Sequence, residues 1–181
     1  VSEKDVVIGI AASSNTPFVV GALEEAHRLG AKTVFLTCNP NTRWSFPVDV
    51  EIGVIVGPEI ITGSTRMKAG TATKLILNMI TTSSMIKIGK VYQNLMVDLT
   101  ATCRKLVDRA HRILLTLTDL TYEEASELLN RADMRVKTAL VMHFRHVDKE
   151  EANRLLEEHR GHVHTAIETQ KKQEDRSTNP A

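Results

Sequence analysis

The 181-residue sequence is poor in cysteine, has no basic surplus and contains no long apolar run. Cys38 and Cys103 are too few for a disulfide framework and too far apart for a Cys-x-x-Cys metal site. The 23 lysines and arginines nearly balance 22 acidic residues, so nothing predicts a nucleic-acid partner. The longest apolar stretches fall far short of the roughly 20 residues that span a bilayer. A cytoplasmic protein without a membrane or nucleic-acid partner is therefore expected.

The composition that is present is that of a globular protein. Hydrophobic residues make up 42% and charged residues 25%, which argues against disorder. The length predicts one domain with a small appendage. The first residue is Val1, and no apolar segment follows a basic start, so no signal peptide is expected.

The first third of the chain alternates between strand and helix patterns. Apolar runs predict strands at 5–11 and 32–38, a more alternating run predicts an edge strand at 49–56, and an amphipathic helix is expected at 18–29. Thr16 is the expected N-cap of that helix, Pro17 its first residue, and Gly30 lies just past its end. Strand, helix and strand in this order predict a βαβ unit and an α/β fold.

The rest of the chain reads as helical. Long helices are expected at 66–89 and 92–117, followed by shorter ones at 122–130, 136–144 and 149–158. The three short helices predict a small helical bundle after a joint at residues 119–120. The expected domains are 1–118, 119–170 for the bundle, and a disordered tail at 171–181 without large apolar side chains.

The first loop that could carry chemistry follows the first strand. Ser13, Ser14 and Thr16 precede a helix N-terminus, whose free N–H groups and partial positive charge favour an anion. The three hydroxyls predict a phosphate-binding loop. Helix capping by Thr16, with the serines filling a turn, also explains the pattern.

The second loop, residues 57–74, also precedes a helix and is denser in polar and small residues. Ser64, Thr65, Arg66 and Lys68 are candidate anion-binding residues, and Glu59 is a nearby carboxylate. Capping alone explains Ser64 or Thr65 but not the whole set, so this loop favours a functional interpretation.

Histidines are concentrated near the C-terminus, where five of the seven lie between His143 and His164. Some are three residues apart, a spacing that can share a metal, but no cysteine and no His-Glu-x-x-His motif accompany them. We expect solvent-exposed histidines and no metal site.

Two segments resemble one enzyme family. The run GPEIITGSTRMKAGTATKLILNMI at 57–80 and the run GKVYQNLMVD at 89–98 resemble the N-acetylmuramic acid 6-phosphate etherases, and the similarity extends over residues 4–167. The resemblance implies a flavodoxin-like parallel sheet of the sugar isomerase type with its N-terminal strands missing, and a homodimer. The vertebrate glucokinase regulatory protein is similar in the first segment.

The resemblance implies removal of D-lactate from the 3-ether of N-acetylmuramic acid 6-phosphate, a phosphorylated amino sugar, without a cofactor. It assigns phosphate contacts to Ser13 and Thr16 and to the set of Ser64, Thr65, Arg66 and Lys68, whereas Ser14 is a candidate from the hydroxyl pattern of the loop alone. It also implies that a first phosphate loop and the acid and base glutamates precede the present chain. Glu59 is the carboxylate of the first matching segment, 57–80, and is a candidate for a catalytic role.

The chain departs from the family at residues 13–16, where SSNT replaces the usual SGRT. Ser14 in place of glycine adds a side chain where backbone should approach a phosphate, and Asn15 removes a cation. Two alternatives to the etherase stay open: a phosphosugar-binding regulator without catalysis, and a truncated product that acts in folding or dimerisation. We expect a dimer held partly by Leu75, Met79 and Leu95.

Overall fold

The computed structural model describes residues 1–14, 16–40 and 46–168. The chain divides into two compact units, Val1–Thr81 and Thr82–Ala181, which are described separately below. Asn15 and the predicted tail at 171–181 lie outside the described residues.

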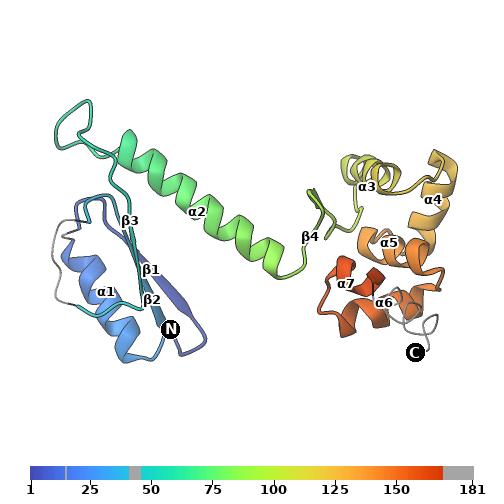
Figure 1. The fold of residues 1–181 in the computed structure, drawn as a ribbon, viewed down its shortest axis with the longest axis horizontal. Coiled ribbons are helices and arrows are strands. Elements are labelled where there is room, and N and C mark those ends of the chain that lie inside the picture. Colours follow the sequence, from blue (N-terminus) through green and yellow to red (C-terminus); the bar gives the residue numbers. More distant parts are fainter. Residues whose placement is uncertain (15, 41–45, 169–181) are drawn as a thin grey trace, which may run out of the picture. The chain divides into compact units, whose positions relative to one another are not determined.

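The first unit is built on a parallel sheet of three strands in the order β1-β2-β3. The elements are β1 (Val6–Ile10), α1 (Pro17–Arg28), β2 (Lys32–Thr37) and β3 (Val50–Gly53). Gly9 pairs with Phe35, and Leu36 pairs with Ile52. The predicted βαβ unit and the edge position of the third strand are confirmed, and each strand is shorter than its apolar run (Figure 1).

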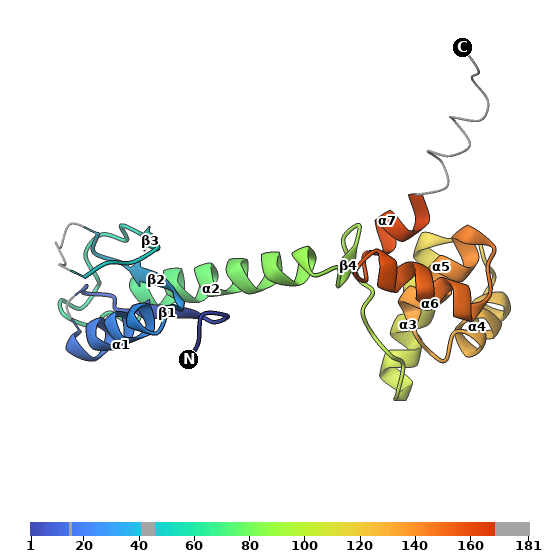
Figure 2. The same ribbon diagram turned by 90° about the horizontal axis from the view of Figure 1, so that it is seen from below.

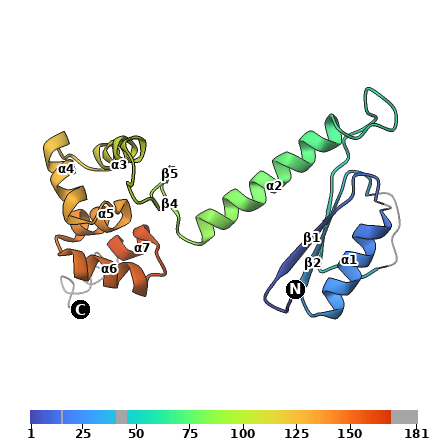
Figure 3. The same cartoon turned by 180° about the vertical axis from the view of Figure 1, so that it is seen from behind.

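Helix α1 covers one face of this sheet (Figures 1 and 3). A small core forms from Ala11, Leu23, Phe35 and Phe46. Position 9 requires glycine, because a Cβ there would lie only 2.6 Å from the Leu23 side chain of α1. The helix begins and ends where expected, with Pro17 in its first turn and Gly30 just beyond it at φ +82°. Thr16 occupies the N-cap position, but its side chain makes no capping hydrogen bond.

The outer edge of β1 pairs with no strand in the part of the chain that the structure describes. Val6 is 61% exposed and Ile10 is 40% exposed on this edge strand. Parallel strands of this apolar type are normally covered on both faces. Within the described part of the first unit, the outer edge of β1 is therefore the place where a further strand or a covering element is lacking.

Helix α2 (Lys68–Lys87) is the long helix predicted at 66–89. It buries Ala69 and Ile76 and leaves Leu75 and Met79 more than half exposed. The helix is followed by Gly89, whose backbone has φ +75°. A Cβ at Gly89 would lie 2.9 Å from the carbonyl oxygen of Gly161, so both the conformation and the space require glycine.

The prediction of a helix over 92–117 is wrong in nearly its first half. Residues 91–96 form an antiparallel hairpin, β4 (Val91–Tyr92) and β5 (Leu95–Met96), and helix α3 begins at Arg104 and ends at Leu117. Gln93 adopts φ +53° in the hairpin turn. Leu95 and Leu99 are four residues apart, which is the spacing of one helix face. Together with the buried Val97 they also form an every-second-residue apolar pattern, which is typical of a strand, so the period alone did not decide between the two.

The remaining helices of the second unit are α4 (Tyr122–Arg131), α5 (Val136–Arg145), α6 (Lys149–Glu158) and α7 (Val163–Glu168). Three of them match the predicted bundle within one or two residues, whereas the short α7 was not expected. Helices α3 to α7 gather around one core that contains Leu114, Leu129, Leu140 and Val163 (Figure 2). The division into domains at residue 119 stays a prediction.

The starts of α4 and α6 are fixed by local capping. The Thr121 hydroxyl accepts a hydrogen bond from the Glu124 backbone, and the Glu124 carboxylate accepts one from the Thr121 N–H, which is a complete capping box. Asp148 caps α6 by accepting from the Glu151 N–H at 2.8 Å. Among the described residues, no helix combines the length and apolar character needed to cross a membrane.

Candidate functional site

A cavity of about 310 Å³ lies in the first unit between the end of β1 and the first turns of α2. Ile10 and Ala12 line it from the strand side. The helix side contributes polar groups, namely Thr65, Thr73, Lys74 and Asn78. The carboxyl ends of parallel strands and helix N-termini are where ligands bind in open α/β sheets. The location and its lining therefore suit a small polar ligand.

Sequence reasoning included Thr73 and Lys74 in the second candidate loop at 57–74 without assigning them to the site, and it missed Asn78. Lys74 and Asn78 are four apart, as are Ala69 and Thr73, so they share one face of α2. This spacing is a signal that could have found them. Gly70 also lines the cavity, and because it has no side chain it leaves the space beside the α2 backbone unfilled.

The first turn of α2 lies beside the end of β2. The Cys38 thiol is 3.7 Å from the carbonyl oxygen of Ala69 and 3.9 Å from the Thr73 hydroxyl. These contacts are those of a weak sulfur donor packed against the helix. They help hold the cavity-lining face of α2 at the strand ends.

Glu59 caps the N-terminus of α2. Its two carboxylate oxygens accept hydrogen bonds from the backbone N–H groups of Lys68 and Ala69, each at 3.0 Å. The backbone N–H groups of Lys68 and then Ala69 lower the pKa of Glu59 below its ordinary value. The carboxylate is therefore held in its ionised form and its two oxygens are already engaged.

The predicted basic and hydroxyl residues before α2 take different positions. Thr65 lines the cavity, whereas Ser64, Arg66 and Lys68 do not. The Lys68 ammonium donates to the carbonyl oxygen of Pro58 at 2.8 Å, which closes the loop that carries Glu59. Arg66 is exposed and Ser64 is half-buried. Contacts between the start of the loop, at Pro58 and Glu59, and its end, at Lys68, thus hold it in place, while Arg66 faces solvent.

The loop after β1 contains two exposed hydroxyls and one buried hydroxyl. Ser13 and Thr16 are exposed, whereas Ser14 is only 3% exposed. The Ser14 hydroxyl hydrogen-bonds to the Thr37 hydroxyl and donates to the carbonyl oxygen of Asn39 at 2.7 Å. None of the three serine and threonine residues of the loop lines the 310 Å³ cavity, although Ala12 directly before them does.

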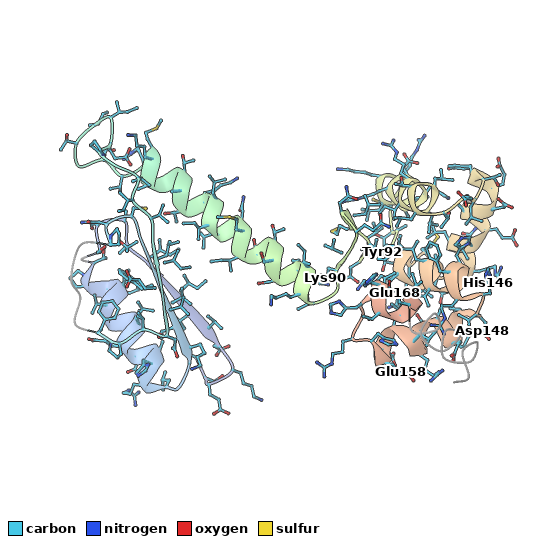
Figure 4. The ribbon with its side chains drawn as sticks, viewed as in Figure 1. Lys90, Tyr92, His146, Asp148, Glu158 and Glu168 are labelled. Carbon is cyan, nitrogen blue, oxygen red and sulfur yellow. The ribbon has the colours of Figure 1, made fainter. Side chains whose placement is uncertain are left out.

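In the second unit, one charged cluster is built on Asp98. Its carboxylate is bound by the ammonium groups of Lys90 and Lys137, the latter at 2.9 Å. Burial raises the pKa of Asp98, but the hydrogen bonds from Lys90 and Lys137 outweigh it and leave the pKa below its ordinary value. The cluster ties the β4–β5 hairpin to α5, and Figure 4 labels Lys90 beside the hairpin.

The histidines of this unit have separate surroundings. The Nε2 atom of His164 lies 3.1 Å from a carboxylate oxygen of Glu168, and its ring lies beside that of Tyr92. Glu168 and Tyr92 are labelled in Figure 4. Burial, followed by the neighbouring His146, lowers the pKa of His143. Within residues 1–14, 16–40 and 46–168, no group of three histidine, cysteine or acidic side chains is placed to hold a metal ion.

Comparison with known proteins finds close relatives of one kind. The chain is 51% identical over 169 residues to an "N-acetylmuramic acid 6-phosphate etherase" of Picosynechococcus, which covers 93% of this chain and 56% of that protein. A Vibrio campbellii protein of the same name is 51% identical, covering 91% of this chain and 54% of that protein. A Staphylococcus saprophyticus protein of that name is 50% identical, covering 92% of this chain and 57% of that protein. The chain thus spans about half the length of these relatives, and no family model matches it.

Proposed function

We propose that this chain, a homologue of the N-acetylmuramic acid 6-phosphate etherases over more than nine tenths of its length, is the phosphosugar-binding part of such an etherase. The observation that carries the proposal is the identity of about half of all residues with proteins of that name. The proposed reaction is removal of D-lactate from N-acetylmuramic acid 6-phosphate, which leaves N-acetylglucosamine 6-phosphate. The proposed fold is of the sugar isomerase type.

The geometry of the first unit supports this proposal. The cavity beside the end of β1 presents Thr65, Thr73, Lys74 and Asn78, which offer hydroxyl, ammonium and amide donors. Such donors suit the hydroxyl and phosphate groups of a sugar phosphate. We place the phosphate near Ser13, Thr16, Ser64 and Thr65, and the sugar ring towards Lys74. Arg66 and Lys68 supply positive charge at the loop before α2.

The proposed chemistry is an elimination followed by an addition. A base removes the proton at C2 of the ring-opened sugar, the bond from C3 to the ether oxygen breaks, and an acid protonates that oxygen as lactate leaves. Water then adds its hydroxyl to C3 and its proton to C2. Glu59 is a poor choice for either group, because its carboxylate is engaged by the backbone of Lys68 and Ala69 and its pKa is lowered. We therefore place the acid and base outside this chain.

Calorimetry with N-acetylglucosamine 6-phosphate tests the proposed binding. The chain is expected to bind this sugar phosphate and not unphosphorylated N-acetylglucosamine. Thr65→Ala or Lys74→Ala, at residues that line the cavity, is expected to weaken binding by about ten- to hundredfold, the effect of losing a hydrogen bond to a charged group. Lys87→Ala, in the last turn of the same helix, is the matched control and leaves the affinity unchanged. Equal affinity for both sugars would contradict the proposal.

A non-catalytic phosphosugar-binding regulator is the alternative from a different class. The observation that favours it is Ser14, which replaces the glycine of the family pattern in the loop after β1. Both proteins bind a sugar phosphate, so binding does not separate them. The two are separated by an assay for released lactate, carried out on a form of this protein that has the full length of its relatives. The etherase releases lactate, whereas a regulator releases none.

A further inference from the structure

Ser14 has a backbone conformation that is unusual for any residue except glycine. Its φ is +66°, in the left-handed region, which a residue with a Cβ rarely adopts. The residue is also buried, with 3% of its surface exposed. A strained, buried serine persists only where its surroundings hold it, so its contacts identify what it does.

The hydroxyl of Ser14 belongs to a closed ring of three hydrogen bonds. The Ser14 hydroxyl donates to the Asn39 carbonyl oxygen at 2.7 Å, and the Asn39 N–H donates to the Thr37 hydroxyl oxygen at 3.1 Å. Ser14 and Thr37 are also hydrogen-bonded to each other. Because the Ser14 proton is already given to Asn39, the Thr37 hydroxyl is the donor in that third bond.

This ring joins the carboxyl ends of two neighbouring parallel strands. Thr37 is the last residue of β2 and is 1% exposed, and Ser14 lies four residues after the end of β1. Two backbone bonds continue the connection, from the Ala11 N–H to the Leu36 carbonyl at 3.0 Å and from the Ser14 N–H to the Ala11 carbonyl at 3.1 Å. The buried hydroxyls thus hold the loop onto the sheet.

We infer that Ser14 is a positioning residue, whose hydroxyl fixes the loop after β1 while Ser13 and Thr16 stay free to meet the ligand. This inference rests on the proposed function for the role of Ser13 and Thr16. In this role Ser14 stands in for the glycine of the family pattern: glycine adopts a positive φ freely, and Ser14 does so because its hydroxyl is bonded twice. Its side chain is directed to the end of β2, away from the solvent that Ser13 and Thr16 face.

Amide hydrogen exchange at Asn39 tests the ring without any ligand. In Ser14→Ala and in Thr37→Val the Asn39 amide is expected to exchange about tenfold faster, because its acceptor is lost or no longer oriented. Thr37→Ser keeps the hydroxyl and is expected to restore slow exchange. Ser13→Ala is the matched control, with exchange at Asn39 unchanged. Slow exchange at Asn39 in Ser14→Ala would overturn the inference.

Two further measurements separate this role from simple stabilisation and from the proposed function. Ser14→Gly is expected to melt at a higher temperature than Ser14→Ala, since glycine removes the strain at φ +66°. Affinity for N-acetylglucosamine 6-phosphate is expected to fall about tenfold in Thr37→Val, although Thr37 is buried and does not line the cavity. Unchanged affinity in Thr37→Val beside a loss in Ser14→Ala would mean that Ser14 binds the phosphate directly. Absence of binding by the unaltered chain would contradict the proposed function and leave the exchange result standing.

Discussion

The carboxylate of Glu59 accepts a hydrogen bond from the backbone N–H of Ala69 at 3.0 Å, ten residues further along the chain. A second bond from the Lys68 N–H completes a cap on α2. The negative charge lies at the positive end of the helix, where it is stabilising. The same charge occupies N–H groups that an anionic ligand would otherwise use.

The cap on α2 should make stability depend on pH. The folded-state pKa of Glu59 is lowered, so its contribution is fully present above the ordinary value of 4.5 and is lost as pH falls through the folded value. Glu59→Gln is expected to lower the melting temperature at pH 7 and to bring the variant and the unaltered chain together at acid pH. Melting curves followed by circular dichroism between pH 3 and 7 measure this, and Glu3→Gln, at the exposed start of the chain, is the control. A constant difference at every pH would contradict the capping role.

Catalysis by the chain alone is expected to be absent. General acid and base groups contribute roughly 10²- to 10⁴-fold each, and binding loops do not replace both. A lactate-coupled assay on the 181-residue chain with N-acetylmuramic acid 6-phosphate should read at background. Turnover at the rate of a relative of full length would make Glu59 the first residue to test as base.

Two glycines should respond oppositely to alanine. Gly89→Ala places a Cβ 2.9 Å from the Gly161 carbonyl at φ +75°, so we expect a loss of about 2–4 kcal/mol in the free energy of unfolding. Gly21→Ala, in the middle of α1 with open space around it, is expected to stabilise by about 0.5–1 kcal/mol. Urea unfolding measures both changes. A neutral Gly89→Ala would show that the Gly161 backbone yields.

Association through exposed apolar residues is the fourth expectation. Leu75 and Met79 are 52% and 59% exposed on α2, whereas Leu95 packs against the core of the second unit and is no longer a candidate contact. Obligate interfaces often bury about 2,000 Å² and are apolar. Light scattering at micromolar concentration is expected to give twice the 20.1 kDa of one chain. Leu75→Lys together with Met79→Lys should yield monomers, and a monomeric unaltered chain would refute the dimer.

Sequence patterns predicted the elements whose signals are local and repeated. The apolar runs of β1 and β2, the capping signals around α1 and the helices from Thr121 to Glu158 were all found. The hairpin at 91–96 was missed because its strands are two residues long, too short to show a period. Helix α7 was missed for the same reason.

The candidate site was harder to predict because it depends on which residues share a surface. The hydroxyl of Ser14 is like those of Ser13 and Thr16 in sequence, yet it alone is buried against Thr37. Glu59 is recognisable as a polar residue, but its bonds to Lys68 and Ala69 depend on how the loop folds back. These tertiary contacts have no signature in one sequence.

The two cores of the chain are very unequal. Among the described residues, the clustered core of the first unit contains Ala11, Leu23, Phe35 and Phe46, with a few further buried apolar residues such as Leu36 and Ile76, while five helices supply the larger core of the second. Burial of apolar surface is the main favourable term in folding, so heat should act on the two units separately. Calorimetry would then show two transitions, the α/β unit melting first, and the melting temperature that a substitution changes would be that of the unit which carries it. A molecule that covers the open edge of β1 would act mainly on the lower transition.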